Sequence, residues 1–232
     1  AIICSLLEKE GISTKQYKNY FVFGTDPVKS HLLDLGKELG VETLSVPSNV
    51  GGRFSVLTPV GFLPALFAGI NVQDLVEGAK EKSLSLLDED VQSNPLLQTA
   101  SFVMDQMQQG KNQTVFMPYS SKLRDFSFWF IQLWAESLGK RIDLDGNIIH
   151  SGLTPIPAYG ATDQHSQMQL FMEGPNDKLL FMIEVENFAN DFSLKSEFKY
   201  PAFEKLSSYN LSDLISAEFH GTLKALKENN RE

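Results

Sequence analysis

The sequence predicts an α/β fold built on parallel sheets. Two short apolar segments, residues 20–23 and 42–46, flank an amphipathic segment that ends at Gly40. This strand–helix–strand order is typical of a parallel pair joined by a right-handed crossover. The chain has 232 residues, of which 42% are apolar, so it is long enough for one large or two modest domains.

The elements of the first part follow in order. Residues 1–10 are predicted to form the last turns of a helix, closed by Gly11. After the first strand, Asp26 could cap a helix that begins at Pro27, because acidic caps and proline suit that position. The apolar segment 54–69 contains two prolines, which predicts a broken helix, and a further helix is predicted over 72–82.

Residues 83–94 are polar and acidic, and they indicate either a helix start or a connection between domains. We therefore expect a first domain over 1–82 and a second over 83–232. Residues 121–138 form a helix that is apolar nearly all round, which predicts deep burial. The other predictions are helices over 96–109, 163–172 and 211–228, strands over 113–117 and 178–185, a turn-rich segment over 141–161 and an irregular one over 187–208.

Composition excludes several classes of protein. The formal net charge is −9 and no basic cluster stands out, which argues against a nucleic-acid partner. Cys4 is the only cysteine, so no intrachain disulfide forms, and a reducing cytoplasm is expected. No apolar run is long enough to cross a membrane, and the N-terminus lacks a basic leader. The chain begins at Ala1 and ends at Glu232 beside helical segments, so we expect both ends to be truncations of a longer protein.

The first candidate site lies in residues 45–55, where a strand ends and Gly51, Gly52 and Arg53 follow. Ligands of parallel α/β sheets bind beyond the carboxyl ends of strands. Glycine lets a ligand approach the backbone, and arginine supplies a permanent positive charge. The alternative interpretation is a tight turn beside a solvated arginine.

The second candidate site is the pair Gln132 and Glu136, which are four residues apart and share one helix face. A carboxylate on so apolar a helix is costly to bury unless it is paired or used. Burial would raise its pKa toward neutrality, as a general base requires. The alternative is a structural ion pair, for example with Lys140.

The third candidate site is a proline- and glycine-rich loop, residues 155–162, that leads into a helix with His165 in its first turns. The N-terminus of a helix favours anions, and Asp163 could orient the histidine or merely cap the helix. A lone histidine is more often structural. No Cys/His cluster has zinc spacing, and no glycine fingerprint supports nucleotide binding.

These segments, in this order, resemble the glucose-6-phosphate isomerase family. Residues 48–61, Ser-Asn-Val-Gly-Gly-Arg-Phe-Ser-Val-Leu-Thr-Pro-Val-Gly, match the first signature of that family throughout. Gln132 with 136–140 resembles its base-bearing helix, and Gly160 with 164–165 its histidine segment. The resemblance implies two sugar-isomerase (SIS) domains, each a flavodoxin-like three-layer sandwich with a parallel sheet, here truncated at both ends.

The resemblance also implies a reaction, the interconversion of glucose 6-phosphate and fructose 6-phosphate in glycolysis and gluconeogenesis. Glu136 would move a proton between C1 and C2 through a cis-enediol, and Arg53 would stabilise the enediolate. Gly52 and Gln132 would line the sugar site. His165 would help to open the sugar ring, contributed across the interface of a homodimer. No metal or organic cofactor is implied.

The family carries two further groups outside the matched segments. Its serine- and threonine-rich phosphate-binding loop precedes the equivalent of Ala1, and a catalytic lysine follows the equivalent of Glu232. We therefore expect this chain alone to have little or no isomerase activity. The alternative is a non-catalytic SIS-type module that binds a sugar phosphate.

Overall fold

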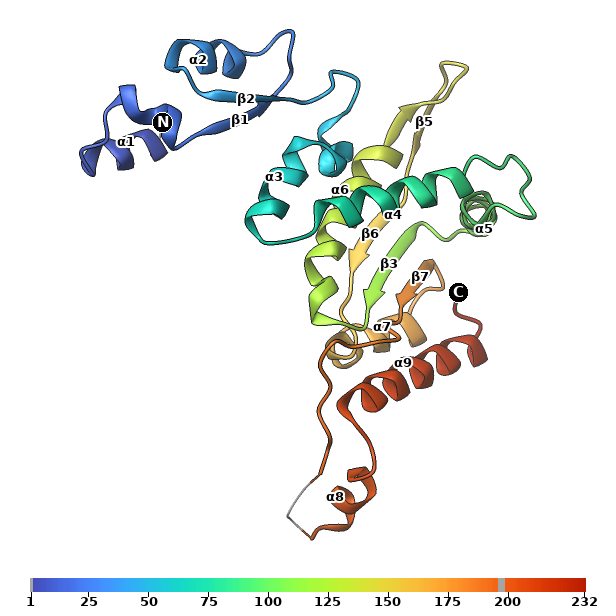
Figure 1. Cartoon of the computed structure of the whole chain (residues 1–232). Helices are drawn as coiled ribbons and strands as arrows, with labels where there is room; N and C mark the ends of the chain where they lie inside the picture. The colour runs from blue at the N-terminus through green and yellow to red at the C-terminus, as the bar shows by residue number, and fades with distance from the viewer. Residues whose placement is uncertain (1, 196–198) are drawn as a thin grey trace. The chain divides into compact units, whose positions relative to one another are not determined.

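The computed structural model describes residues 2–195 and 199–232 (Figure 1). Contacts divide the chain into two compact units, the first ending at Asn94 and the second beginning at Pro95. Each unit contains parallel strands joined through helices, which confirms the α/β fold class. Among the described helices, none is both long and apolar enough to cross a membrane.

The first unit is built around two parallel strands with Val22 opposite Glu42. The intervening helix ends at Gly40, whose φ of 65° suits glycine. Its elements are α1 Ile2–Lys9, η1 Thr14–Asn19, β1 Val22–Thr25, α2 His31–Leu39, β2 Glu42–Ser45, η2 Gly52–Leu57, α3 Pro59–Phe67 and α4 Val72–Ser85.

The start of α2 differs from the sequence prediction. Asp26 does not cap it; its Oδ1 accepts hydrogen bonds from the backbone N–H groups of Val28 and Lys29, at 2.8 and 2.9 Å. These bonds close a turn ahead of the helix. Ser30 is the cap, because its Oγ accepts from the N–H of Leu32 at 3.1 Å. The helix therefore begins later than Pro27.

The broken helix over 54–69 is present, and Thr58 causes the break. Its extended backbone separates η2 from α3, and its Oγ1 accepts from the N–H of Val60 at 3.3 Å. Pro59 occupies the first helical position, where the missing N–H costs nothing. At Gly61 an added Cβ would lie 2.0 Å from the carbonyl oxygen of Val56, so this glycine is required by packing.

The second unit is built on three parallel strands in the order β6–β3–β7. Phe116 of the central strand lies opposite Pro157 on one side and Phe181 on the other. Its elements are α5 Pro95–Gln108, β3 Gln113–Pro118, η3 Ser121–Leu123, α6 Arg124–Leu138, β4 Lys140–Ile142, β5 Ile148–Ser151, β6 Thr154–Pro157, η4 Thr162–His165, α7 Met168–Glu173, β7 Lys178–Ile183, α8 Pro201–Leu206 and α9 Leu211–Glu228.

Strand β6 falls inside the segment that the sequence indicated as turns. Its two prolines are tolerated because β6 is an edge strand. The N–H groups of Thr154 and Ala158 donate to the carbonyl groups of Asn112 and Phe116, both at 3.0 Å. By alternation, the nitrogens of Pro155 and Pro157 point away from β3, where no donor is needed. The same segment also contains the antiparallel pair β4–β5.

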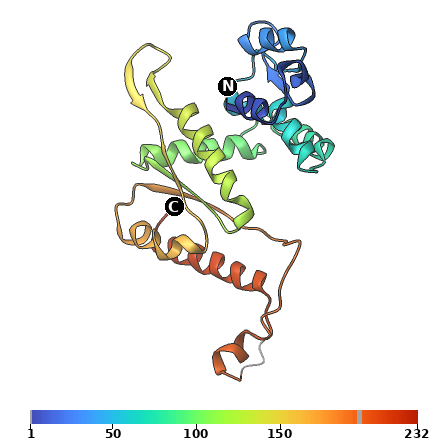
Figure 2. The ribbon, with the colours of Figure 1, turned by 90° about the vertical axis from the view of Figure 1, so that its left-hand side faces the viewer.

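The strands of the second unit lie between two helical layers (Figure 2). Val115 and Met117 of β3, together with Tyr119 directly after it, pack with Phe219 of α9 and Phe171 of α7. On the other face, Val103 of α5 packs with Leu179 of β7 and with Trp134 of α6. The alternation along β3 and β7 thus supplies both inner faces of a three-layer sandwich.

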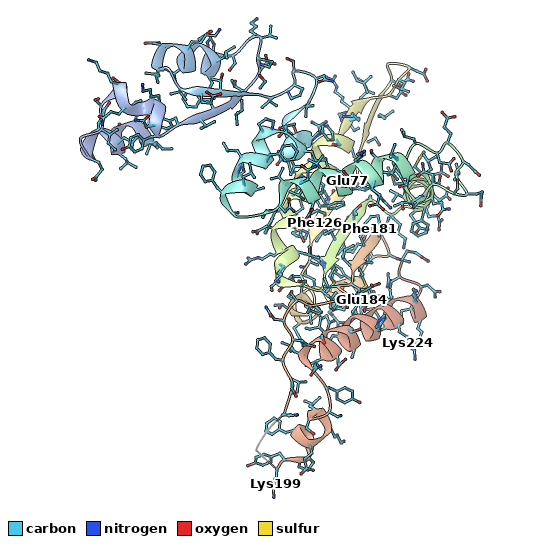
Figure 3. The ribbon with its side chains drawn as sticks, in the orientation of Figure 1. Glu77, Phe126, Phe181, Glu184, Lys199 and Lys224 are labelled. Carbon is cyan, nitrogen blue, oxygen red and sulfur yellow. The ribbon has the colours of Figure 1, made fainter. Side chains whose placement is uncertain are left out.

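Helix α6 is not deeply buried, contrary to the sequence prediction. Phe130 stacks on Phe116 with centroids 4.4 Å apart, so one face of the helix covers the sheet. Phe126 and Phe128 are 45% and 53% exposed, and Figure 3 shows Phe126 on this helix and Phe181 on β7. The helix is apolar nearly all round, yet this unit covers only the face that meets the strands.

Two further predictions are corrected. The single helix expected over 163–172 is divided into η4 and α7. The segment expected to be irregular contains α8, and part of it, residues 196–198, lies outside the described residues.

Candidate functional site

The segment 45–55 begins at the carboxyl end of β2, beside the end of β1. A hydrogen bond from the Ser48 side chain lowers the pKa of Asp26, and the backbone N–H groups of Lys29 and Val28 lower it further. Asp26 follows β1 directly. This carboxylate therefore ties the start of the glycine-containing segment to the neighbouring strand.

Gly52 and Arg53 open the short helix η2. The Gly52 carbonyl accepts a hydrogen bond from Ser55 Oγ at 2.6 Å, which closes the turn. A Cβ added at Gly52 would meet no described atom within 4 Å, and Gly51 has an ordinary φ of −66°. Neither glycine is needed by the fold of its own segment, in contrast to Gly61.

The half-buried Arg53 lies with its guanidinium 4.6 Å from the ring centroid of Phe54. This is cation–π distance, and the ring restricts the orientation of the long side chain. The segment thus offers a positive charge beside backbone that carries no side chain at Gly52. Such an arrangement suits a small anionic or polar ligand.

Gln132 and Glu136 lie together on α6, with Gln132 Nε2 3.4 Å from Glu136 Oε2. Phe130 and Trp134 turn toward the sheet, where both pack near Phe181. Gln132 and Glu136 each lie two residues after one of these aromatic residues. Two residues along an α-helix rotate the side-chain direction by about 200°, so Gln132 and Glu136 point away from the strands. Both side chains are exposed. The expected burial of Glu136 is therefore not met in this chain, and its role as a base stays a prediction.

The loop after β6 is held by a set of specific contacts. An added Cβ at Gly160 would lie 2.5 Å from the ring of Tyr119, so only glycine fits there. Asp163 Oδ2 accepts from the N–H of Tyr159 at 2.7 Å, and its Oδ1 accepts from Ser166 Oγ at 2.6 Å. Asp163 therefore closes the turn on either side of itself.

Gln164 fixes the next step of this loop. Its Nε2 donates to the hydroxyl of Tyr119 at 2.7 Å and to Thr222 Oγ1 at 2.8 Å. The glutamine is thus held between the end of β3 and helix α9. His165 follows directly and is exposed. The histidine is presented to solvent on a segment whose backbone is well fixed.

Glu136 and His165 lie at opposite ends of the strands of the second unit. Glu136 is near the amino ends of the strands, and His165 is near their carboxyl ends. Helix α6 starts at Arg124, just after β3, and Glu136 is twelve residues along it, about 18 Å on. Beyond Glu136, Gly139 lies against Gly152 near the start of β6. His165, by contrast, follows the end of β6, as the course of α6 and β6 in Figure 1 shows.

Sequence reasoning missed a hollow at the carboxyl ends of β3 and β6. It has a volume of about 590 Å³, and Arg124 and Tyr159 are among the residues that line it. A signal was present, since hydroxyl residues at 119–121 directly follow a buried apolar strand. In the described part of the chain, no group of three or more His, Cys, Asp or Glu side chains is placed to hold a metal ion.

A family model described as phosphoglucose isomerase matches residues 28–188, which is more than half of the chain. The chain belongs to this family. A glucose-6-phosphate isomerase of Carboxydothermus hydrogenoformans is 42% identical over 97% of this chain, and a probable one of Methanococcus maripaludis is 39% identical over 99%. The chain spans about half of these relatives, 48% of each.

Solved structures agree with the family in fold. A hypothetical protein of Thermus thermophilus superposes with a TM-score of 0.89 at 34% identity, covering 98% of this chain and 54% of its own. A glucose-6-phosphate isomerase of Chlamydia trachomatis gives a TM-score of 0.64 at 20% identity, covering 94% of this chain and 41% of its own. The second likeness shows the fold alone. The three-layer α/β prediction is confirmed.

Proposed function

We propose that this chain contributes to an aldose–ketose isomerase that interconverts glucose 6-phosphate and fructose 6-phosphate. The observation that carries the proposal is the family match over residues 28–188, which spans all three predicted segments. Relatives of the same family carry this activity in their names. The pathway would be glycolysis and gluconeogenesis, and the compartment the cytoplasm.

In this proposal Glu136 acts as the base. Its carboxylate removes the proton from C2 of the open-chain aldose and returns it to C1, through a cis-enediol. Arg53 stabilises the negative charge that develops on the enediolate oxygen. Gln132 orients the carboxylate, at 3.4 Å from it, and also lines the sugar site with Gly52. This route uses no metal ion or organic cofactor.

His165 would act on the substrate of a second chain in a homodimer. The geometry of the second unit supports this, because Glu136 and His165 lie at opposite ends of its strands. Helix α6 begins near the carboxyl ends of the strands, where His165 lies, and Glu136 is twelve residues or about 18 Å further along it. The two side chains therefore cannot both reach one hexose carbon. If both serve one reaction, the histidine must come from a partner. Its exposed position on a fixed loop suits that role.

Because the chain spans about half of its relatives, the experiment compares the chain alone with the chain placed in a full-length relative. We would assay the 232-residue chain alone, and a chimera in which it replaces the matching part of the Carboxydothermus hydrogenoformans enzyme. Fructose 6-phosphate would be converted in an assay coupled to glucose-6-phosphate oxidation. We expect little or no turnover by the chain alone and clear turnover by the chimera.

Two matched variants of the chimera test the base. Glu136→Gln should lower kcat by about 10²–10⁴-fold with unchanged folding, because general-base catalysis is typically worth that much. Glu173→Gln, on the exposed end of α7, should leave kcat unchanged. Full activity in the Glu136→Gln chimera would refute the assignment of the base. A chimera that binds the sugar phosphate without turning it over would favour the non-catalytic module instead.

A further inference from the structure

The order of the strands in the second unit marks a position for a ligand. The chain runs from β3 through α6 to β6, and then through α7 to β7 on the other side of β3. The connection that follows β3 and the connection that follows β6 therefore run in opposite directions across the sheet. In open parallel sheets, ligands bind in the crevice beyond the carboxyl ends of strands at such a switch point. Here this point lies between the carboxyl ends of β3 and β6, at the opposite end of these strands from Glu136.

A hollow is present at this point. Its volume of about 590 Å³ falls within the range of about 300–1,000 Å³ that is typical of small-ligand sites. Its walls come from the start of α6 and from the loop after β6. The residues that give it chemical character are Ser121, Arg124, Phe128, Tyr159, Thr162 and Asp163.

The floor of the hollow is rigid. Ala158 and Ser127 are buried, and the hydroxyl of Ser127 donates a hydrogen bond to the carbonyl of Leu123 at 3.3 Å. The loop above is fixed by the hydrogen bond from the Tyr159 N–H to Asp163. A fixed wall loses little conformational entropy when a ligand binds.

The polar groups of the hollow favour a phosphate. Arg124 is exposed and forms no ion pair with another described residue, and its guanidinium fork matches phosphate oxygens. Ser121 and Thr162 add hydroxyl donors to the same wall. Asp163 is an opposing charge, but its Oδ2 and Oδ1 already accept hydrogen bonds from the Tyr159 N–H and from Ser166 Oγ, which fix the carboxylate within its own turn.

The apolar part of the hollow fits the rest of a small ester. The ring of Phe128 lines it and is exposed for about half of its surface. Aromatic faces pack well against apolar C–H surfaces such as those of a sugar ring. We propose that this hollow is a second binding site, for a small phosphorylated sugar, with Arg124 as its phosphate anchor. The proposal does not depend on the isomerase function.

The test measures binding of inorganic phosphate and of glucose 6-phosphate to the 232-residue chain by calorimetry. Arg124→Gln should weaken phosphate binding by about tenfold or more, the typical loss for a charge-assisted hydrogen bond. Arg141→Gln is the matched control, because Arg141 is an exposed arginine on β4, outside the hollow. It should bind phosphate like the unaltered chain. Equal losses in both variants would show non-specific attraction and overturn the proposal.

Two further variants guard the interpretation. Ser121→Asp places a second carboxylate in the hollow and should abolish phosphate binding while circular dichroism stays unchanged. Arg53→Gln tests the competing anion site in the first unit, where Arg53 lies. If Arg53→Gln removes the binding and Arg124→Gln does not, the anion binds at Arg53 and the proposal is wrong. Failure of glucose 6-phosphate to displace phosphate would also overturn it.

Discussion

Strand β1 of the first unit and strand β3 of the second each lead through a helix to a parallel neighbour, but their surroundings are very different. In β3, five of six residues are buried, with strands on both sides and helices on both faces. In β1 no residue is fully buried, and its only described strand partner is β2. A hollow of about 640 Å³ lies on the first unit, lined mainly by apolar residues of α1, α2 and segment 17–23.

This difference teaches that a β-α-β pattern fixes connectivity without fixing burial. The second unit has both helical layers within its own sequence, so a buried apolar cluster lies on each face of its sheet. The first unit covers its strands with α2 and leaves apolar side chains such as Leu32 and Leu35 partly exposed. Hydrophobic stabilisation follows buried area, so we expect the second unit to hold most of the stability of the chain.

The largest test of this comparison is Met117→Ala. Met117 is fully buried in β3, and truncating a buried methionine costs about 2–5 kcal/mol through lost transfer energy and a cavity. Met104→Ala on α5 is the control, because Met104 is 61% exposed and its loss should cost less than about 0.5 kcal/mol. Urea unfolding followed by tryptophan fluorescence reports the second unit, since Trp129 and Trp134 both lie on α6.

A small loss in Met117→Ala, similar to that in Met104→Ala, would mean that the packing of β3 contributes little to stability. The comparison between the units would then fail. A loss in the expected range, with an unchanged dependence on urea concentration, would show that the native core is weakened rather than the unfolded state altered.

Sequence patterns predicted the connectivity better than the burial. The strands at β1, β2, β3 and β7 were predicted because apolar residues cluster between turn signals. Strand β6 was missed because prolines at 155 and 157 cannot donate hydrogen bonds, and only the sheet shows that their nitrogens point outward. The burial of α6 was misjudged because composition does not reveal which face of a helix finds a partner.

The second test compares two glycines in the candidate sites. Gly160→Ala should destabilise the second unit by about 1–3 kcal/mol, because the new methyl group would meet the ring of Tyr119 at 2.5 Å. Gly52→Ala in the first unit should leave stability within about 0.5 kcal/mol, since no described atom lies within 4 Å of the new Cβ. Thermal unfolding of both variants measures the contrast.

For Gly52, we expect a change in the activity of the chimera without a change in its stability. If Gly52 lines the sugar site, its substitution should raise KM while the melting temperature stays constant. Equal stability losses in both variants would remove the distinction between a glycine needed for packing and one that leaves room for a ligand.

For the candidate site residues, the sequence could predict local pairing along the chain but not how the residues are arranged in space. The pairing of Gln132 with Glu136 follows from helical spacing and is present. The separation of Glu136 from His165 could not be predicted, because it depends on the direction of α6 relative to β6. The role of Asp163 was left open by the sequence, and the structure shows it closing the turn between Tyr159 and Ser166.

The smallest expected effect is a pH dependence in the first unit. The hydrogen bond from Ser48, followed by those from the N–H groups of Lys29 and Val28, lowers the pKa of Asp26 below that of an ordinary aspartate. A lowered pKa means that the folded state favours the charged form. The stability gained is therefore fully present above the unfolded pKa of about 3.9 and is lost as the pH falls through the folded pKa.

Amide hydrogen exchange in residues 20–46 measures this effect without interference from the second unit. Asp26→Asn should increase exchange at about pH 6 and converge with the unaltered chain once the pH has fallen below the folded pKa of Asp26, where both side chains are neutral. Ser48→Ala removes only the largest contribution to the pKa shift and should give part of the same change. An Asp26→Asn chain with unaltered exchange near neutral pH would show that this carboxylate does not tie the glycine-containing segment to β1. The second unit, whose core is made of uncharged side chains, should keep its protection in both variants.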